Sequence, residues 1–277
     1  MITRISILLL FLVWHPIAIA QVSDSKISRL QETEFAFEVK TIDEFIERFN
    51  NDQYMLIREY MQSNFPDKKL SRLDLIRTLF NYQDPAWSES DALAFSNAIL
   101  DPKAEKFLDF YSDTWFAEAD CRVKYKGVSK RVRITLQVFV SDRTGAAKWV
   151  VCGARAAFLD FSKRTDPKKF LNPISHATDF IGLKKAMEDK AFIRNYLAED
   201  FRESHLNKYL AAVATGDIIF GQVESITYHF LSVPEWLFTV KEFRRKGKNS
   251  GWLIHSLSRR SDAEKLDYLK NTLNCDQ

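Results

Sequence analysis

The chain has 277 residues, of which 46% are apolar and 13% aromatic, so it is long enough to bury one large core or two of ordinary size. A formal net charge of +3 is too small to indicate a nucleic-acid partner, and we expect none. No glycine-rich phosphate-binding motif occurs in the sequence, and we expect no cofactor.

The first 20 residues have the pattern of a secretory signal peptide. Arg4 gives a positive start, Ile5 to Trp14 is apolar, and Ala18-Ile19-Ala20 is a small-x-small cleavage site. The apolar run is shorter than the roughly 20 residues that a membrane-spanning helix needs. We expect residues 1–20 to be removed and the mature chain to be periplasmic or extracellular, with no stable membrane insertion. A buried N-terminal strand or helix is the alternative.

Residues 41–100 contain several segments with the periodicity of a helix. Ile42, Phe45, Ile46 and Phe49 recur at the spacing of one helix face, and Thr41 before them can cap a helix. Further helices are predicted over residues 54–61, 70–80 and 88–100.

The period then changes from that of a helix to that of a strand. Residues 131–140 alternate between apolar and polar side chains, and residues 117–126 and 148–157 are strand-like on either side. Gly127 and Gly145 lie where hairpin turns are needed. This pattern predicts an antiparallel meander with one face on a core.

The second half repeats this order. Residues 164–169 are polar and contain Pro167, which predicts a domain boundary between lobes 21–163 and 171–277. Helices, three strands and a C-terminal helix are then predicted, as follows: helices 175–188, 190–197 and 205–215; strands 218–233, 237–243 and 251–258; last helix 261–273. We therefore predict an α+β fold of two tandem lobes, each with helices packed on a curved antiparallel sheet. A diverged duplication explains the shared order, and convergence is the alternative.

Three cysteines are present, and we expect no disulfide. Cys121 and Cys152 are predicted on the first and third strands of a meander, where two strand spacings separate their Cα atoms by roughly 9–10 Å. A disulfide needs less than about 7 Å. Both are therefore predicted to be small buried side chains, and no cysteine has the spacing of a metal ligand.

Few residues suggest a catalytic or ligand-binding function, and none is assigned a catalytic or metal-binding role. His176 and Asp179 lie three residues apart at a predicted helix start, where they form an acid–base pair or only a helix cap. Tyr228, Trp252 and His255 lie on predicted strands and complete a possible pocket. The alternative is that the aromatic residues of the second sheet are core.

Segments of the second half resemble the cone-shaped fold of nuclear transport factor two and the ketosteroid isomerases. These segments are residues 175–180, 223–230 and 249–254, and residues 37–158 resemble a less regular copy. The style is also similar to that of exported, uncharacterised proteins of gut-type Bacteroidota. The resemblance implies a fold that hosts isomerases, dehydratases, cyclases and binding modules, so it carries no catalytic residue over.

The sequence thus favours a non-catalytic exported protein that binds an unknown small molecule or an envelope protein. The alternative is a small-molecule isomerase, cyclase or hydrolase with a pocket in the second lobe. A structural component of a cell-envelope assembly is a third possibility.

Overall fold

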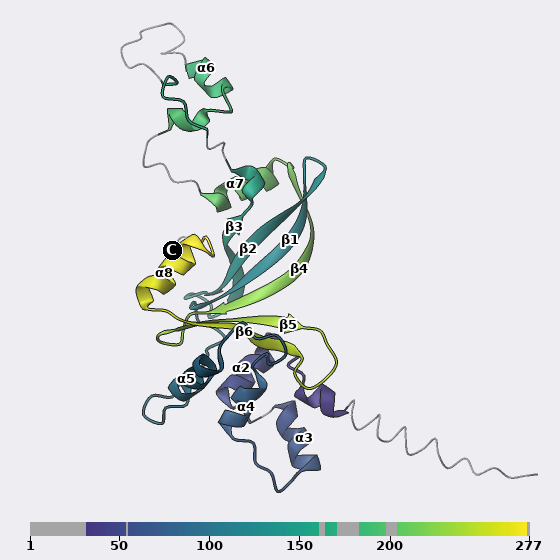
Figure 1. Ribbon diagram of the computed structural model, residues 1–277. Coiled ribbons are helices and arrows are strands. Elements are labelled where there is room, and N and C mark those ends of the chain that lie inside the picture. The colour runs from purple at the N-terminus through teal and green to yellow at the C-terminus, as the bar shows by residue number, and fades with distance from the viewer. Residues whose placement is uncertain (1–31, 54, 161–163, 171–182, 198–203, 276–277) are drawn as a thin grey trace, which may run out of the picture.

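One antiparallel sheet runs through the protein, and helices pack against it at both ends (Figure 1). The computed structural model describes residues 32–53, 55–160, 164–170, 183–197 and 204–275. The predicted signal peptide lies outside these residues. Within the described ranges, no helix is both long and apolar enough to cross a bilayer.

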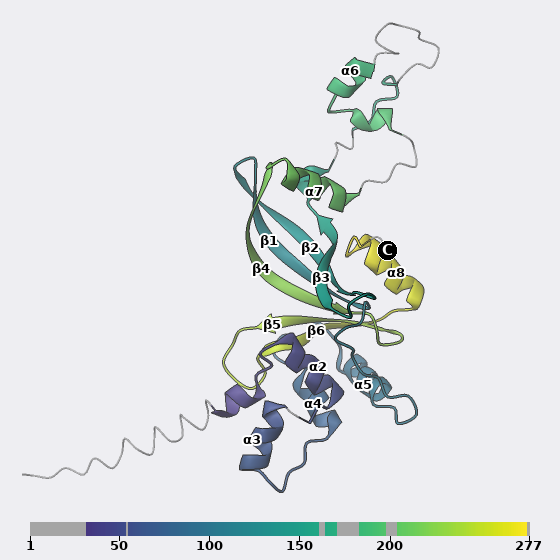
Figure 2. The same ribbon diagram turned by 180° about the vertical axis from the view of Figure 1, so that it is seen from behind.

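The N-terminal helices form as their sequence patterns predict. They are α2 (Ile42–Asn50), α3 (Leu56–Asn64), α4 (Arg72–Thr78) and α5 (Glu89–Ile99). The side chains of Thr41, Ser71 and Ser88 accept hydrogen bonds from backbone N–H groups in the first turns of α2, α4 and α5. Figures 1 and 2 show these helices gathered beneath strands β5 (Trp236–Phe243) and β6 (Gly251–Arg259).

The predicted first meander is confirmed. Its strands are β1 (Trp115–Tyr125), β2 (Val128–Val140) and β3 (Ala147–Arg155). Gly127 and Gly145 occupy the two turns with positive φ of 82° and 67°, a conformation that glycine adopts without a Cβ penalty.

A long connection joins β3 to the next strand. This connection contains η1 (Ala157–Leu159), α6 (Leu183–Glu188), η2 (Ile193–Tyr196) and α7 (His205–Ala214). Only a short 3₁₀ turn lies where a helix over 190–197 is predicted. β4 (Ile218–Phe230), β5 and β6 come next, and α8 (Asp262–Asn271) ends the fold.

The strands of both halves belong to one sheet, in the order β3-β2-β1-β4-β5-β6. β1 pairs with β4 along its whole length, from Trp115 opposite Phe230 to Tyr125 opposite Ile218. The mixed α+β class is therefore correct, but two lobes with separate sheets are not confirmed. β1 and β4, the first strands of the two halves, form backbone hydrogen bonds with each other, and this pairing satisfies one edge of each strand.

The two ends of the apolar sheet face have separate hydrophobic clusters. The larger cluster joins α2, α4 and α5 to β5, β6 and the start of β1, and its centre is aromatic: Phe45, Phe49, Phe95, Trp115, Phe230 and Phe238. The smaller one packs α7 on β1, β2 and β4, through Tyr209 and Ala212. Alternate residues of β1 face this side of the sheet. Trp115, at the start of the strand, belongs to the first cluster, and Cys121 and Val123, further along it, belong to the second.

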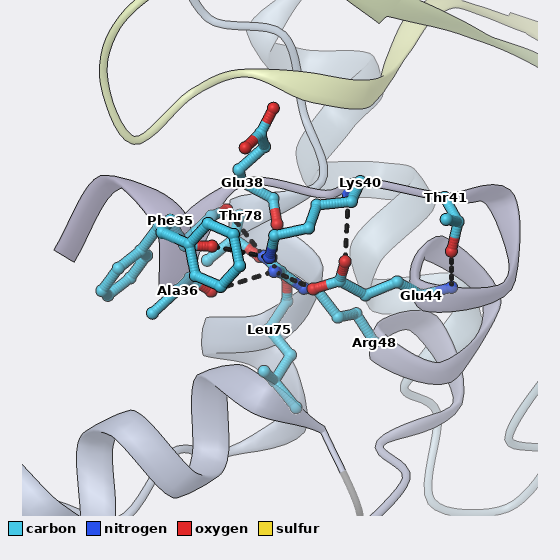
Figure 3. A network of polar contacts seen from close by, with 10 residues as sticks. Phe35, Ala36, Glu38, Lys40, Thr41, Glu44, Arg48, Leu75 and Thr78 are labelled. Atoms are coloured by element: carbon cyan, nitrogen blue, oxygen red, sulfur yellow. Dashed lines mark hydrogen bonds and ion pairs between the residues drawn. The ribbon is translucent and has the colours of Figure 1, made fainter. Parts of the chain in front are cut away.

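A buried arginine ties the chain before α2 to that helix (Figure 3). The guanidinium of Arg48 donates to the carbonyl oxygens of Ala36, Phe37 and Glu38 at 3.1, 2.8 and 2.7 Å. It also pairs with the Glu44 carboxylate at 2.5 Å, and the residue is fully buried. Arg48 therefore fixes the backbone that leads to the sheet edge at residue 39.

That edge depends on a glycine. Val39 bridges to Gly251 in parallel, and the Trp252 N–H donates to the Val39 carbonyl at 2.8 Å. Gly251 has φ of 84°, and a Cβ on it would overlap the Val39 carbonyl oxygen.

Gly251→Ala is expected to lower the free energy of unfolding by about 2–3 kcal/mol, because it adds left-handed strain and displaces Val39. Urea denaturation measures the change. Gly247→Ala, at another positive φ but in open space, is the control and should cost less. Equal costs for the two substitutions would contradict the close approach.

The expectation of no disulfide is wrong. Cys152 on β3 is bonded to Cys275, which follows α8, across 123 residues of sequence and with Cα atoms 5.0 Å apart. Cys121 is a buried free thiol, as predicted, and β2 does separate it from β3. Cys275 could not be predicted as the partner of Cys152, because the two residues meet only when the C-terminal segment folds back against β3.

Candidate functional site

The structure brings together two of the predicted pocket residues. The rings of Tyr228 on β4 and Trp252 on β6 lie 4.9 Å apart. His255 does not join them, since its ring lies beside Phe243 at 5.9 Å. His176 and Asp179 lie outside the described residues.

Tyr228 and Trp252 are half of a longer line of rings, here called the aromatic row: Trp149, Trp115, Tyr228 and Trp252. Successive centroids are 5.0, 5.7 and 4.9 Å apart. The row crosses from β3 through β1 and β4 to β6, so strands from both halves build it. The sequence predicted Tyr228 and Trp252 as pocket residues but not Trp115, because the pairing of β1 with β4 is not visible in either strand alone.

The row is buried at its centre and more open at one end. Trp115 is 1% exposed, whereas Trp149 is 38% exposed. The Trp115 indole N–H donates to the Phe110 carbonyl at 3.1 Å, and the Phe110 ring lies 5.4 Å from the indole. The hydrogen bond and the ring contact thus hold Trp115 in place, while the neighbouring Trp149 is partly exposed to solvent.

A hollow of about 580 Å³ lies against Trp149. Its walls come from the loop before β1 and from the β2–β3 hairpin: Phe110, Tyr111, Val138, Val140, Lys148 and Trp149. Tyr111 is 60% exposed, and Lys148 is a charged group in the wall. The volume lies within the range of small-molecule sites, and the lining has the mainly apolar character that such sites share.

Most other aromatic residues of β4 and β5 are core, as the alternative interpretation predicted. Phe230, Trp236 and Phe238 are nearly inaccessible and belong to the larger hydrophobic cluster. Phe220, by contrast, is exposed and packs in neither of the two main clusters.

The other sheet face holds a polar cluster beside α8: Glu118, Arg133, His229 and Tyr268. His229 and Thr227 lie opposite Phe116 and Glu118 in the β1–β4 register, so their side chains share a face. The His229 Nδ1 and the Tyr268 hydroxyl oxygen are 2.9 Å apart and share a hydrogen bond. His229 is 4% exposed, and its Nε2 has no hydrogen-bond partner among the described residues.

Burial dominates the ionisation of this cluster. It raises the pKa of Glu118, although the Arg133 guanidinium, 3.7 Å from the carboxylate, acts in the opposite direction. Burial also raises the pKa of Tyr268 to about 12. Burial, with help from Lys241 and Arg133, lowers the pKa of His229 to about 4. All three groups are therefore neutral over a wider pH range than in water.

The depressed pKa of His229 predicts acid sensitivity. Below the unfolded pKa of about 6.5 the unfolded chain binds a proton that the folded chain excludes until about pH 4. The free energy of unfolding should fall by about 3 kcal/mol as pH drops through this window. His229→Gln should flatten that part of a stability–pH curve measured with urea. A curve as steep as that of the unsubstituted protein would contradict the assignment.

No described cluster of three or more His, Cys, Asp or Glu side chains could hold a metal ion.

Comparisons with known proteins give no relative: no protein-family model, curated protein or solved structure matches the chain. The function is therefore argued from the site alone.

Proposed function

We propose that this chain is an exported, non-catalytic binding protein that takes its ligand in the hollow beside Trp149. The observation that carries the proposal is the aromatic row, whose buried centre positions a half-open tryptophan against a hollow of about 580 Å³. Rigid aromatic side chains supply a large contact area and lose little conformational entropy on binding. The ligand is a small molecule or an envelope protein that offers a flat apolar group to Trp149 and Tyr111.

The disulfide supports the export part of the proposal. Disulfides persist in oxidising compartments and are rare in the cytosol. Cys152 and Cys275 are bonded, and the sequence begins with the pattern of a cleavable signal. Mass spectrometry of the N-terminus of the protein from the periplasm or medium tests this: a start at Gln21 is expected, and an intact N-terminus in the cytosol would contradict it.

The binding test compares two variants of the mature chain. Trp149→Ala removes the open end of the row, and Leu93→Ala on α5 removes an apolar group that is 62% exposed elsewhere. Each protein is immobilised and incubated with an envelope extract, and bound proteins and small molecules are quantified by mass spectrometry. We expect at least one species to be lost roughly tenfold with Trp149→Ala and retained with Leu93→Ala. Identical recoveries from all three proteins would contradict the proposal.

A finer account of the fold is also a proposal. We infer that the two halves arose by duplication of a helix-and-meander unit related to the cone fold of nuclear transport factor two. The three strands of each half stay adjacent in the sheet, and the third strands carry Trp149 and Trp252 at matching places. Superposition of β1–β3 on β4–β6 in a crystal structure tests this. Tryptophans that project from unlike faces would contradict it.

A small-molecule isomerase, cyclase or hydrolase is the second candidate, and one observation favours it. Glu118 and His229 share a sheet face, and burial raises the pKa of Glu118 and lowers that of His229, so a carboxylic acid and a neutral imidazole lie close together on that face. Turnover of a model ester or ketosteroid that disappears in Glu118→Gln, with unchanged thermal stability, would favour this candidate. Turnover that survives the substitution would remove it.

A further inference from the structure

Strand β4 has a partner on only one side over most of its length. It pairs with β1 from Ile218 to Phe230, but β5 pairs with it only from Thr227 to Phe230. In the upper part of the sheet, where β5 has diverged, Figures 1 and 2 show β4 as the outermost strand. Among the described residues, nothing pairs with the other edge over residues 218–226. This segment, here called the open edge, is roughly 30 Å of extended backbone.

The open edge is exposed on both faces as well as along its side. Every residue from Ile219 to Ser225 is exposed. Three of these residues are large and apolar, with exposed fractions of 62% for Ile219, 51% for Phe220 and 47% for Val223. A strand with unpaired N–H and C=O groups and apolar side chains is a template for another strand.

The outer edge of β6 is protected in a way that the open edge is not. The outer edge of β6 is covered by bridges from Val39, Phe80 and Ala86. Edge strands are commonly blunted by lysine or proline, and residues 218–226 contain neither. Glu224 is the one charged residue in the segment, and its carboxylate accepts a 2.6 Å hydrogen bond from Arg122. The open edge therefore has no covering segment from the described part of the chain, no lysine and no proline, and its blunting features are Glu224 and the two register shifts at Gly221 and Glu224 in its pairing with β1.

The charge around the open edge indicates which strand it accepts. Exposed basic side chains project from the adjoining β1–β2 hairpin: Arg122, Lys124, Lys126, Lys130 and Arg131. Near them the acidic groups are Glu224, which pairs with Arg122 and Arg131, Asp217, which lies 4.0 Å from Lys126, and Asp120, which lies 3.4 Å from Arg133. Basic groups exceed acidic ones there, so an added strand with acidic side chains is favoured over a basic one.

There is also room for the end of such a strand. Where β4 and β5 separate lies a cleft of about 380 Å³, and its charged lining residues are of both signs: Asp120, Glu224, Lys241, Glu242 and Arg244. The cleft continues the line of β5, which is the position that an added neighbour of β4 would occupy.

We propose that the open edge binds an extended acidic and apolar segment of a partner polypeptide by strand addition. Backbone hydrogen bonds to residues 218–226 would supply the pairing, as in other strand-addition complexes. Ile219, Phe220 and Val223 contact apolar side chains of the segment, and the hairpin's basic groups contact its carboxylates. This surface is separate from the hollow beside Trp149.

Fluorescence anisotropy of labelled peptides with the mature chain tests the proposal. The probes are ten-residue peptides of alternating Val and Glu, the same design with Lys in place of Glu, and the Glu peptide with N-methyl groups on alternate residues. We expect the Val-Glu peptide to bind at least tenfold more tightly than the other two, and less tightly at high salt.

Val223→Asp places a repelling carboxylate on the open edge, and Leu93→Asp places one on α5. Only Val223→Asp should weaken binding of the Val-Glu peptide, by about tenfold or more, while melting temperatures of both variants stay close to that of the original protein. Equal binding of all three peptides, or an unchanged affinity in Val223→Asp, would overturn the proposal. So would a dimer in sedimentation that Val223→Asp dissociates, because the open edge would then pair with a second copy.

Discussion

Replacing both Cys152 and Cys275 with serine is expected to lower the free energy of unfolding by about 4–5 kcal/mol. The bond closes a loop of 123 residues in sequence separation, and the entropy that it removes from the unfolded chain approaches the upper end of the range for disulfides. The folded state loses contacts as well, since the C-terminal segment packs on β3 and β1 through Leu269, Leu273 and Phe116. Urea denaturation without reductant measures the difference.

Reduction offers an independent control for the disulfide. Dithiothreitol should lower the stability of the original protein to that of the double variant and leave the variant unchanged. Cys121 does not confound the comparison, because burial raises the pKa of its thiol to about 11 and suppresses its reactivity in the folded state. Coincident denaturation curves with and without reductant would contradict the bond or its contribution.

Arg48→Met is expected to cost about 3–5 kcal/mol, the range for breaking a buried charge pair. Methionine keeps much of the apolar stem but removes the Arg48 donor from the carbonyls of residues 36–38 and from the Glu44 carboxylate, which retains only the Lys40 N–H. The segment that leads to Val39 then loses its attachment, and the bridge between Val39 and Gly251 should weaken with it.

Arg77→Met, at an exposed position on α4, is the matched control and should cost less than about 0.5 kcal/mol. Hydrogen exchange adds a local measure: the Trp252 amide, which donates to the Val39 carbonyl, should exchange faster in Arg48→Met. An Arg48→Met variant as stable as Arg77→Met would show that the guanidinium is not the anchor.

Local patterns predicted the elements well. Thr41 caps a helix where the sequence indicated, because a capping side chain and its amide partner are three residues apart. The alternation in β2 predicted the burial of Val132, Ile134 and Val138, whereas Val140 on the same side is 37% exposed and Thr135 on the other side is buried. Such features depend on neighbours in sequence.

Features that depend on distant partners were not predicted. The alternation of β1 and β4 defines their faces but not their pairing, so the sequence favoured two sheets over the one observed. Arg48 lies on an amphipathic helix, where an arginine is ordinarily solvated, and only the path of residues 36–38 buries it. Of the candidate site, Tyr228 and Trp252 were predicted, whereas the Trp115 floor and the hollow beside Trp149 require the assembled sheet.

The aromatic row exists only if β1 pairs with β4, because that pairing alone sets Trp115 beside Tyr228. Nuclear Overhauser contacts between the side chains of Ala119 and Ile226, which are direct partners in the register, measure the pairing in solution. We expect strong contacts between these two residues and between Ala117 and Tyr228. Their absence, with contacts within each meander intact, would mean that the halves form separate sheets and that Tyr228 and Trp252 do not continue the aromatic row.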